Sequence, residues 1–219
     1  SDDYSGPTSN DFSSPQNSNT MKFVPHCAFH VFNQGNNRQA VFFSEDNYAF
    51  FFEKMRIHLM PYADILAYCL MPNHFHWLIV PRSYSCQMQP NKGCAEKQVL
   101  SHQIGILLSS YSRAVNVQEE RSGSLFRAKT KAKTGWITEG VDFSNKMEYN
   151  LRSPEDQYAH TCFEYIHQNP VKAGLTGRPE DWPHSSAGEY YGYSEHRMCN
   201  KEMAAEYQFY LMADPVGRL

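Results

Sequence analysis

Hydrophobic residues recur along this chain with two spacings, and the spacing predicts which segments form strands and which form helices. Apolar residues form short alternating or continuous runs, as is typical of strands, in VPHCAFHVFN (24–33), DILAYCL (64–70) and HFHWLIV (74–80). Met-Pro-Asn joins the last two runs, and Pro-Asn favours a turn. We therefore predict one strand at 24–33 and a β-hairpin formed by 64–70 and 74–80.

Apolar residues three and four positions apart predict two amphipathic helices. The first covers residues 45 to 60 and the second follows a polar loop at 82–95. Their apolar faces carry Tyr48, Phe51, Phe52, Met55 and Leu59 in the first, and Leu100, Ile104, Leu107, Leu108 and Tyr111 in the second.

A third helix is indicated by its end signals. Ser153-Pro154 followed by two acidic residues is typical of a helix start, and Asn169-Pro170 is expected to end the helix. A last short helical stretch is predicted near 201–212. Because strands and helices are mixed and the hairpin is antiparallel, we expect an α+β fold with helices packed on an antiparallel sheet.

Composition and charge refine this picture. The chain has 219 residues and a net charge of -3. Residues 1–20 contain Asp2, Asp3 and Asp11 but no Lys or Arg, and they are rich in Ser, Asn and Pro, so we predict a disordered leader there. The remainder is electrically balanced, which favours selective over general binding of nucleic acid. We predict one domain at 21–190 and a C-terminal extension at 191–219.

Two further features bear on location. No apolar run approaches the roughly 18 residues that cross a bilayer, so we expect no membrane partner. The six cysteines form neither a CxxC pair nor a zinc-ligand spacing. Free thiols in a reducing cytoplasm are therefore the expected state.

Candidate chemistry begins with two histidines inside an apolar run. His74 and His76 are two positions apart, so on a strand they point to the same face, while Phe75 points to the other. Two neutral imidazoles on one rigid strand can hold a divalent metal ion. The alternative is a pair of half-buried histidines that hydrogen-bond to the backbone.

A second pair lies on the third helix. Tyr165 and Asn169 are four positions apart and therefore share one helix face. Asn169 offers an oxygen for a metal ion, and Tyr165 offers a hydroxyl that can act as a covalent nucleophile. The alternative is that Tyr165 packs on the sheet and Asn169 caps the helix end.

A basic segment suggests nucleic-acid contacts. No acidic residue interrupts the segment from Arg121 to Glu139. Its later cations, Arg127, Lys129, Lys131 and Lys133, occupy alternating positions and would face one side of a strand. The residues that we assign to phosphate contacts are Arg38, Arg121, Arg127, Lys129, Lys131, Lys133 and Lys172. Trp136 and Trp182 are candidates for base stacking or for the core. The alternative for the segment is a charged edge strand that resists aggregation.

Several of these stretches resemble one family. The chain from about residue 28 to about 186 is similar to the HUH single-tyrosine transposases, and in particular to the REP-associated tyrosine transposases. The resemblance is carried by MPNHFHWLIV and YIHQNPVKAGL, and by FHVFNQGNNRQAVFF, LLSSYSRAVN, SGSLFRAKTKAK and DWPHSS. The inserts CQMQPNKGCAEKQ and TEGVDFSNKMEYNLRSPED depart from the family spacing.

The resemblance implies a fold and an activity. The fold would be ferredoxin-like (RRM-like), with the His-hydrophobic-His pair on a central strand. The activity would be that of a metal-dependent endonuclease and strand transferase acting on single-stranded DNA with hairpins or palindromic repeats. Tyr165 would be the nucleophile, and His74, His76 and Asn169 would bind Mg²⁺ or Mn²⁺. The protein would work as a monomer or homodimer.

The sequence is also compatible with other assignments. Tyr111 is a rival nucleophile, but Val115, four positions on, cannot ligate a metal. A domesticated relative would bind hairpins without cutting them. A metal hydrolase would use water as its nucleophile and form no covalent adduct. Because a histidine ligates a metal only when neutral, activity is expected to fall below about pH 6.5.

Overall fold

The computed structural model describes residues 22–91, 94–133 and 154–207. The predicted leader, Trp136 and Ser153 lie outside them. The strands are β1 (Phe29–Gln34), β2 (Ala63–Met71), β3 (His74–Pro81), β4 (Met88–Asn91), β5 (Cys94–Gln98) and β6 (Lys131–Lys133). The helices are α1 (Glu45–His58), α2 (Val99–Gln118), α3 (Pro154–Lys172), α4 (Ala187–Tyr191) and α5 (Lys201–Glu206). Short 3-10 turns are η1 (Asn36–Arg38), η2 (Ser83–Cys86) and η3 (Pro179–Asp181).

A four-stranded sheet forms the centre of the structure. Its strand order is β2-β3-β1-β6, and each neighbouring pair is antiparallel. β2 and β3 form the predicted hairpin, with Met71 opposite His74 across the turn. The prediction of an α+β fold with helices packed on an antiparallel sheet is confirmed. β3 lies inside the sheet, between β2 and β1.

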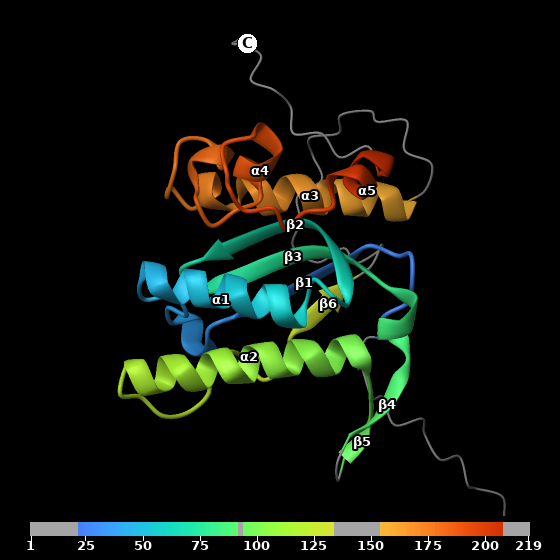
Figure 1. Ribbon diagram of the computed structural model, residues 1–219. Coiled ribbons are helices and arrows are strands. Elements are labelled where there is room, and N and C mark those ends of the chain that lie inside the picture. Colours follow the sequence, from blue (N-terminus) through green and yellow to red (C-terminus); the bar gives the residue numbers. More distant parts are fainter. Residues whose placement is uncertain (1–21, 92–93, 134–153, 208–219) are drawn as a thin grey trace, which may run out of the picture.

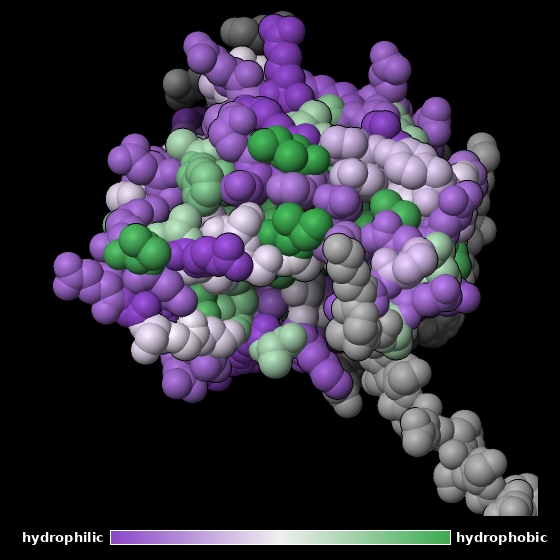
Figure 2. Space-filling model, turned by 60° about the horizontal axis from the view of Figure 1, so that its bottom comes forward, coloured by the Kyte–Doolittle hydropathy of each residue, from purple (hydrophilic) through white to green (hydrophobic). Residues whose placement is uncertain are grey.

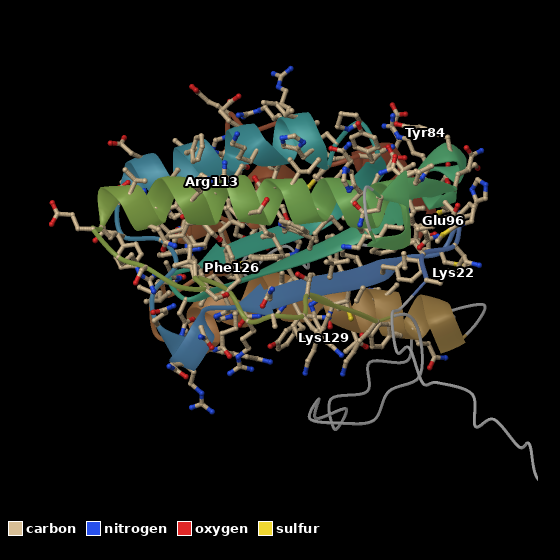
Figure 3. All side chains as sticks on the ribbon, turned by 90° about the horizontal axis from the view of Figure 1, so that it is seen from below. Lys22, Tyr84, Glu96, Arg113, Phe126 and Lys129 are labelled. Carbon is tan, nitrogen blue, oxygen red and sulfur yellow. The ribbon has the colours of Figure 1, made fainter. Side chains whose placement is uncertain are left out.

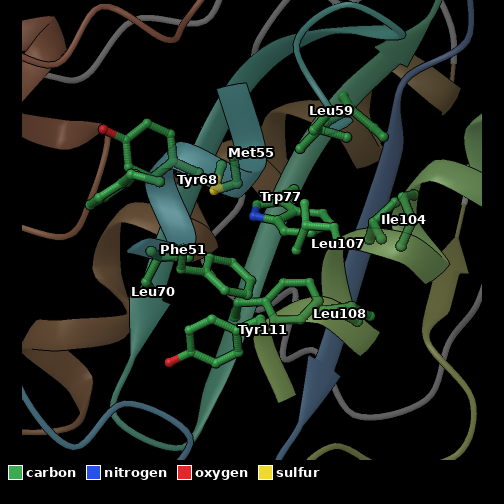
Figure 4. Packing of buried hydrophobic residues seen from close by; sticks show 14 of the residues in the cluster. Phe51, Met55, Leu59, Tyr68, Leu70, Trp77, Ile104, Leu107, Leu108 and Tyr111 are labelled. Carbon is green, nitrogen blue, oxygen red and sulfur yellow. The ribbon is translucent and has the colours of Figure 1, made fainter. Parts of the chain in front are cut away.

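Helices α1 and α2 cover one face of the sheet (Figure 1). Alternation along β3 sends Phe75, Trp77 and Ile79 to this face, where they join one buried cluster. Figure 4 shows Phe51 of α1 and Tyr111 of α2 beside Trp77 in this cluster. The two apolar helix faces predicted from the sequence are thus buried against the sheet.

Helix α3 covers the opposite face, with α4 and α5 beside it (Figure 1). Leu78 and Val80 of β3 meet Phe163 and Ile166 of α3 in a second buried cluster. Even-numbered residues of β3 therefore face α3. His74 and His76 belong to this even-numbered set, so the sheet directs them toward the third helix.

The segment after α4 also rests on this face. Ala204 of α5 is buried in the second cluster, and the Asn200 N–H donates to the Ile65 carbonyl oxygen at 2.8 Å. The buried Glu189 carboxylate accepts from Tyr68 Oη at 2.7 Å and from the N–H of Cys199 at 3.1 Å. These bonds attach the chain after residue 190 to β2.

Three predicted elements differ from the observed ones. The first strand starts at Phe29 rather than at residue 24. The predicted polar loop at 82–95 contains η2 and the start of a two-stranded ribbon, β4–β5. Within the described part of the basic segment, residues 121–133, only Lys131–Lys133 form a strand, so Arg127 and Lys129 do not share a strand with Lys131 and Lys133. Backbone pairing decides each of these: β1 and β6 pair with strands that are distant in sequence, whereas β4 pairs with the nearby β5.

The prediction that α3 ends at Asn169-Pro170 is wrong. The helix continues to Lys172, with Pro170 in its last turn, and the Ala173 N–H still donates to the Asn169 carbonyl oxygen at 3.0 Å. Proline removes a single backbone donor, and burial of Ile166 holds the preceding turn against the sheet. Gly174, at φ +70°, ends the helix instead.

Among the described residues, no helix is both long enough and apolar enough to span a bilayer. On the face shown in Figure 2, hydrophobic side chains lie as separate spots among polar ones.

Candidate functional site

The two β3 histidines lie together on the α3 side of the sheet, as predicted from their positions two residues apart on a strand. His76 is buried and His74 is half-buried, and their ring centroids are 5.0 Å apart. The Nδ1 atom of His74 donates to Oδ1 of Asn73 at 2.6 Å. Both rings are attached to an interior strand, so ladder hydrogen bonds on both sides fix their position.

A third histidine joins them from β1. His30 is buried, and its Nε2 lies 2.8 Å from Nδ1 of His76. The two rings are stacked, with centroids 5.0 Å apart. In the pairing of β1 with β3, Phe32 lies directly opposite His76, so His30 reaches His76 diagonally.

Helix α3 brings Tyr165 and Asn169 to this cluster. The ring of Tyr165 lies edge-on to His76, with centroids 5.4 Å apart, and 6.1 Å from the His30 centroid. Asn169 lies close enough to His74 to act on its ring, since its amide raises the pKa of His74 against the larger effect of burial. The structure therefore brings together all four residues that the sequence predicted for metal and nucleophile.

Burial lowers the pKa of each histidine in the cluster. The pKa of His30 falls to about 4, first because its ring is desolvated and then because Lys133 repels added positive charge. The pKa of His76 is well below the usual value because of burial and repulsion from His30 and His74. Burial also lowers the pKa of His74, against the opposing effect of Asn169. Burial thus favours the neutral form of all three rings, which is the form that can bind a metal ion.

The donor set fits a divalent cation. Nε2 of His76 is buried without a hydrogen-bond partner, and such an orphaned nitrogen needs an explanation. Because Nδ1 of His74 is used by Asn73, its Nε2 carries the lone pair. Nδ2 of Asn169 donates to the Tyr165 carbonyl oxygen at 3.4 Å, which leaves its Oδ1 available. In the described part of the chain, no three His, Cys, Asp or Glu side chains are arranged to hold a metal ion among themselves. The candidate ligands are therefore the imidazoles of His74 and His76 and the amide of Asn169.

Three of the predicted DNA-contact residues lie near this cluster. Lys133 is opposite His30 and Lys131 is opposite Phe32 in the pairing of β6 with β1, so both lysines point to the α3 face. The ammonium group of Lys172 lies 5.6 Å from the Tyr165 ring centroid. A row of positive charge therefore flanks the histidines and the tyrosine.

The other four cations are placed elsewhere. Arg127 and Lys129 are exposed on the segment before β6, and Figure 3 labels Lys129. Arg38 is exposed on η1. Arg121 donates to Oε1 of Gln39 at 2.8 Å, so its guanidinium already joins two loops.

The loop that carries Arg38 is held tightly. A Cβ at Gly35 would collide with the Gln39 carbonyl oxygen, so glycine is required there. The Gly35 N–H donates to the Asn73 carbonyl oxygen at 2.8 Å. The loop is thereby attached to the β2–β3 turn, next to His74.

Tyr111 and Trp182 lie outside this cluster. Tyr111 is fully buried on the α1/α2 face, and its hydroxyl donates to the Val41 carbonyl oxygen at 2.7 Å. Nε1 of Trp182 donates to the Leu70 carbonyl oxygen at 3.0 Å. Both rings therefore serve packing in this structure.

Sequence reasoning missed His30. The signal was available, because His30 lies between Phe29 and Val31, which are both fully buried on the α1/α2 face. Alternation alone places His30 on the other face, with the β3 histidines. What the sequence did not contain is the register of β1 on β3.

Comparison with known proteins gives one structural likeness. The fold is similar to the solved structure of a REP-associated tyrosine transposase bound to a REP hairpin, with a TM-score of 0.51 and 14% sequence identity. The match covers 81% of this chain and 87% of that one. At this identity the likeness shows a shared fold. No family model and no curated protein matches the sequence.

Proposed function

We propose that this protein is a metal-dependent single-stranded DNA transesterase of the REP-associated tyrosine transposase type. It would cut and rejoin DNA that contains hairpins or palindromic repeats. The observation that carries the proposal is the position of Tyr165, whose ring lies edge-on to His76 on the face of the sheet where Asn169 acts on His74. The fold shared with a hairpin-bound tyrosine transposase supports it.

We also propose that the fold is ferredoxin-like, with the His-hydrophobic-His pair on a central strand. Apart from the β4–β5 ribbon inserted before α2, the chain order β1-α1-β2-β3-α2-β6 and the sheet order β6-β1-β3-β2 support this assignment. In a ferredoxin-like fold, two βαβ units place both of their helices on one face of the sheet. The opposite face would then be free to receive α3 and its tyrosine.

In the proposed reaction, Tyr165 is the nucleophile. Its Oη would attack the phosphorus of the scissile phosphodiester, forming an O–P bond while the bond to the 3′ oxygen breaks. The phenolic proton would pass through solvent to the departing oxygen, which becomes a 3′-hydroxyl. The phosphotyrosine ester retains the bond energy, so a second 3′-hydroxyl can displace Tyr165 and rejoin the strand.

His74, His76 and Asn169 would hold Mg²⁺ or Mn²⁺. When bound, the ion supplies charge that polarises the scissile phosphate. Imidazole is softer than the ligands that magnesium prefers, so we expect manganese to bind more tightly. Lys131, Lys133 and the other predicted cations would contact phosphates along the strand.

The remaining assignments are proposals of the same kind. We assign residues 21–190 to the catalytic domain and 191–219 to a C-terminal extension. We propose that the protein is a monomer or homodimer. We also propose a cytoplasmic location, because the thiols of Cys27, Cys69, Cys86, Cys162 and Cys199 are free.

A denaturing-gel assay tests the proposal. Labelled single-stranded hairpin oligonucleotides are incubated with Mn²⁺ and the wild type, Tyr165→Phe or Tyr111→Phe, with EDTA as the metal-free control. We expect a covalent adduct with the wild type and Tyr111→Phe, and none with Tyr165→Phe or EDTA.

Other outcomes would contradict the proposal in different ways. An adduct lost only with Tyr111→Phe would overturn the assignment of the nucleophile. Cleavage without an adduct would indicate a metal hydrolase that uses water. Hairpin binding without cleavage would indicate a DNA-binding protein that lacks catalysis.

A further inference from the structure

The His30–His76 contact is the starting point. The two rings come from neighbouring strands, β1 and β3, and both are buried. Nε2 of His30 and Nδ1 of His76 are 2.8 Å apart, within normal hydrogen-bond distance. At this distance one nitrogen of the pair carries the hydrogen and the other accepts it.

The choice of donor decides whether Nε2 of His76 can bind a cation. If His30 donated, the proton of His76 would lie on Nε2, a buried atom without any partner among the described residues. A buried Nε2 without a partner costs about 1–3 kcal/mol in either tautomer, but a cation can satisfy only the lone pair and never an Nε2–H. If His76 donates from Nδ1, its Nε2 is a lone pair, and the His30 proton lies on Nδ1, which is not buried without a partner.

His74 shows the same arrangement through a different neighbour. Its Nδ1 contacts Oδ1 of Asn73, and a carbonyl oxygen can only accept, so His74 must donate from Nδ1. Both β3 histidines would then have Nδ1 used by a neighbour and Nε2 free. Metal-binding histidines commonly have one ring nitrogen fixed in this way by a hydrogen bond.

We propose that His30 is a positioning residue, whose Nε2 accepts a hydrogen bond from Nδ1–H of His76 and so leaves the Nε2 lone pair of His76 for the divalent cation. This inference rests on the proposed function, because it assigns His30 a role toward the proposed metal site. His30 would not touch the ion or the DNA. Its effect is on the tautomer and the ring orientation of His76.

The first test needs neither metal nor a variant. Long-range ¹H–¹⁵N correlation spectra of ¹⁵N-histidine-labelled wild type in EDTA report which nitrogen of His76 carries the proton. We expect protonated Nδ1 and unprotonated Nε2. A proton on Nε2 of His76 would overturn the proposal, whatever the activity of the protein.

The second test compares His30→Phe with His30→Gln. Phenylalanine keeps the ring bulk but accepts no hydrogen bond, whereas Oε1 of glutamine can replace Nε2 as the acceptor. Mn²⁺ affinity is measured from the free-ion EPR signal. We expect a loss of about 10–100-fold in His30→Phe and recovery of most of it in His30→Gln.

A matched control removes a histidine elsewhere. His58 on α1 hydrogen-bonds to Gln103 on the other side of the sheet, and His58→Phe should leave Mn²⁺ affinity unchanged. Equal Mn²⁺ affinity in His30→Phe and the wild type would overturn the proposal. Absence of Mn²⁺ binding by the wild type would instead count against the proposed function, while the role of His30 in setting the His76 tautomer would still be decided by the spectra.

Discussion

The ring of Tyr165 on α3 meets the imidazole of His76 on β3 edge-on, with an interplanar angle of 84° and centroids 5.4 Å apart. Neither residue is near the other in sequence. Their meeting requires that α3 pack on the face of the sheet that the even-numbered residues of β3 occupy, and burial of Leu78 with Phe163 provides that packing. The hydrophobic core therefore sets the position of the proposed nucleophile.

Asn169 is predicted to be needed for catalysis because of its oxygen. Asn169→Ala removes the amide beside His74, and adduct formation should slow by at least about tenfold as one of three ligands is lost. Asn169→Asp retains an oxygen and adds charge, so Mn²⁺ binding should be retained. Rates are measured on the denaturing gel. The exposed neighbour Gln168, replaced by alanine, is the control, and equal rates for both alanine variants would remove Asn169 from the site.

Lys131 and Lys133 are predicted to bind phosphates of the strand. Both point to the face that holds the proposed nucleophile. Replacing both by glutamine should make the plot of log affinity against log salt less steep by about 1.4, since each contact with single-stranded DNA contributes about 0.7. Binding of a labelled hairpin is measured by fluorescence anisotropy across salt concentrations.

A matched double variant controls for net charge. Lys54→Gln with Arg113→Gln removes two positive charges from α1 and α2, on the opposite face; Arg113 is labelled in Figure 3. This variant should retain the wild-type salt slope. Equal effects of the two double variants would mean that long-range charge, and not contact, governs binding.

Glu189 is predicted to be a main anchor of the chain after residue 190. Its buried carboxylate accepts from Tyr68 Oη and from the N–H groups of Met198 and Cys199. Glu189→Ala leaves these three donors without their acceptor, so the free energy of unfolding should fall by about 3 kcal/mol. Tyr68→Phe removes one of the three bonds and should lower it by about 1 kcal/mol. Urea unfolding measures both, and a loss below 1 kcal/mol for Glu189→Ala would show that water replaces the carboxylate.

Acid is predicted to destabilise the fold through its buried histidines. The pKa is lowered from 6.5 to about 4 for His30 and to about 3 for His167, chiefly because burial disfavours the charged ring. Below pH 6.5 the unfolded chain binds protons at these positions while the folded chain does not. The stabilisation is thus fully present above pH 6.5 and is lost as the pH falls toward the folded pKa values, by up to about 1.4 kcal/mol per pH unit for each histidine.

The measurement is urea unfolding between pH 7 and 5 in EDTA. His167→Gln should reduce the slope of unfolding free energy against pH by about 1.4 kcal/mol per unit between pH 6 and 5. Phe163→Leu changes a ring that packs edge-on to His167, with centroids 4.4 Å apart, and should lower stability at every pH and leave the slope unchanged. An unchanged slope in His167→Gln would mean that His167 is protonated in the folded protein.

The local elements were readable from the sequence. Alternation on residues 74–80 predicted a strand with both histidines on one face, and three- and four-residue spacing predicted α1 and α2. These patterns arise because each residue of a strand or helix faces a fixed direction relative to its neighbours, and the core must be apolar. The pairing of Tyr165 with Asn169 on one helix face followed in the same way.

The sequence did not determine which distant segments meet. The register that stacks His30 against His76, the short β6 that points Lys131 and Lys133 at the same face, and the continuation of α3 through Pro170 were all decided by the tertiary structure. Periodicity in a sequence reports direction within one element. The contacts between elements depend on how whole apolar faces pack together, and that packing placed the three histidines, the amide and the tyrosine in one cluster.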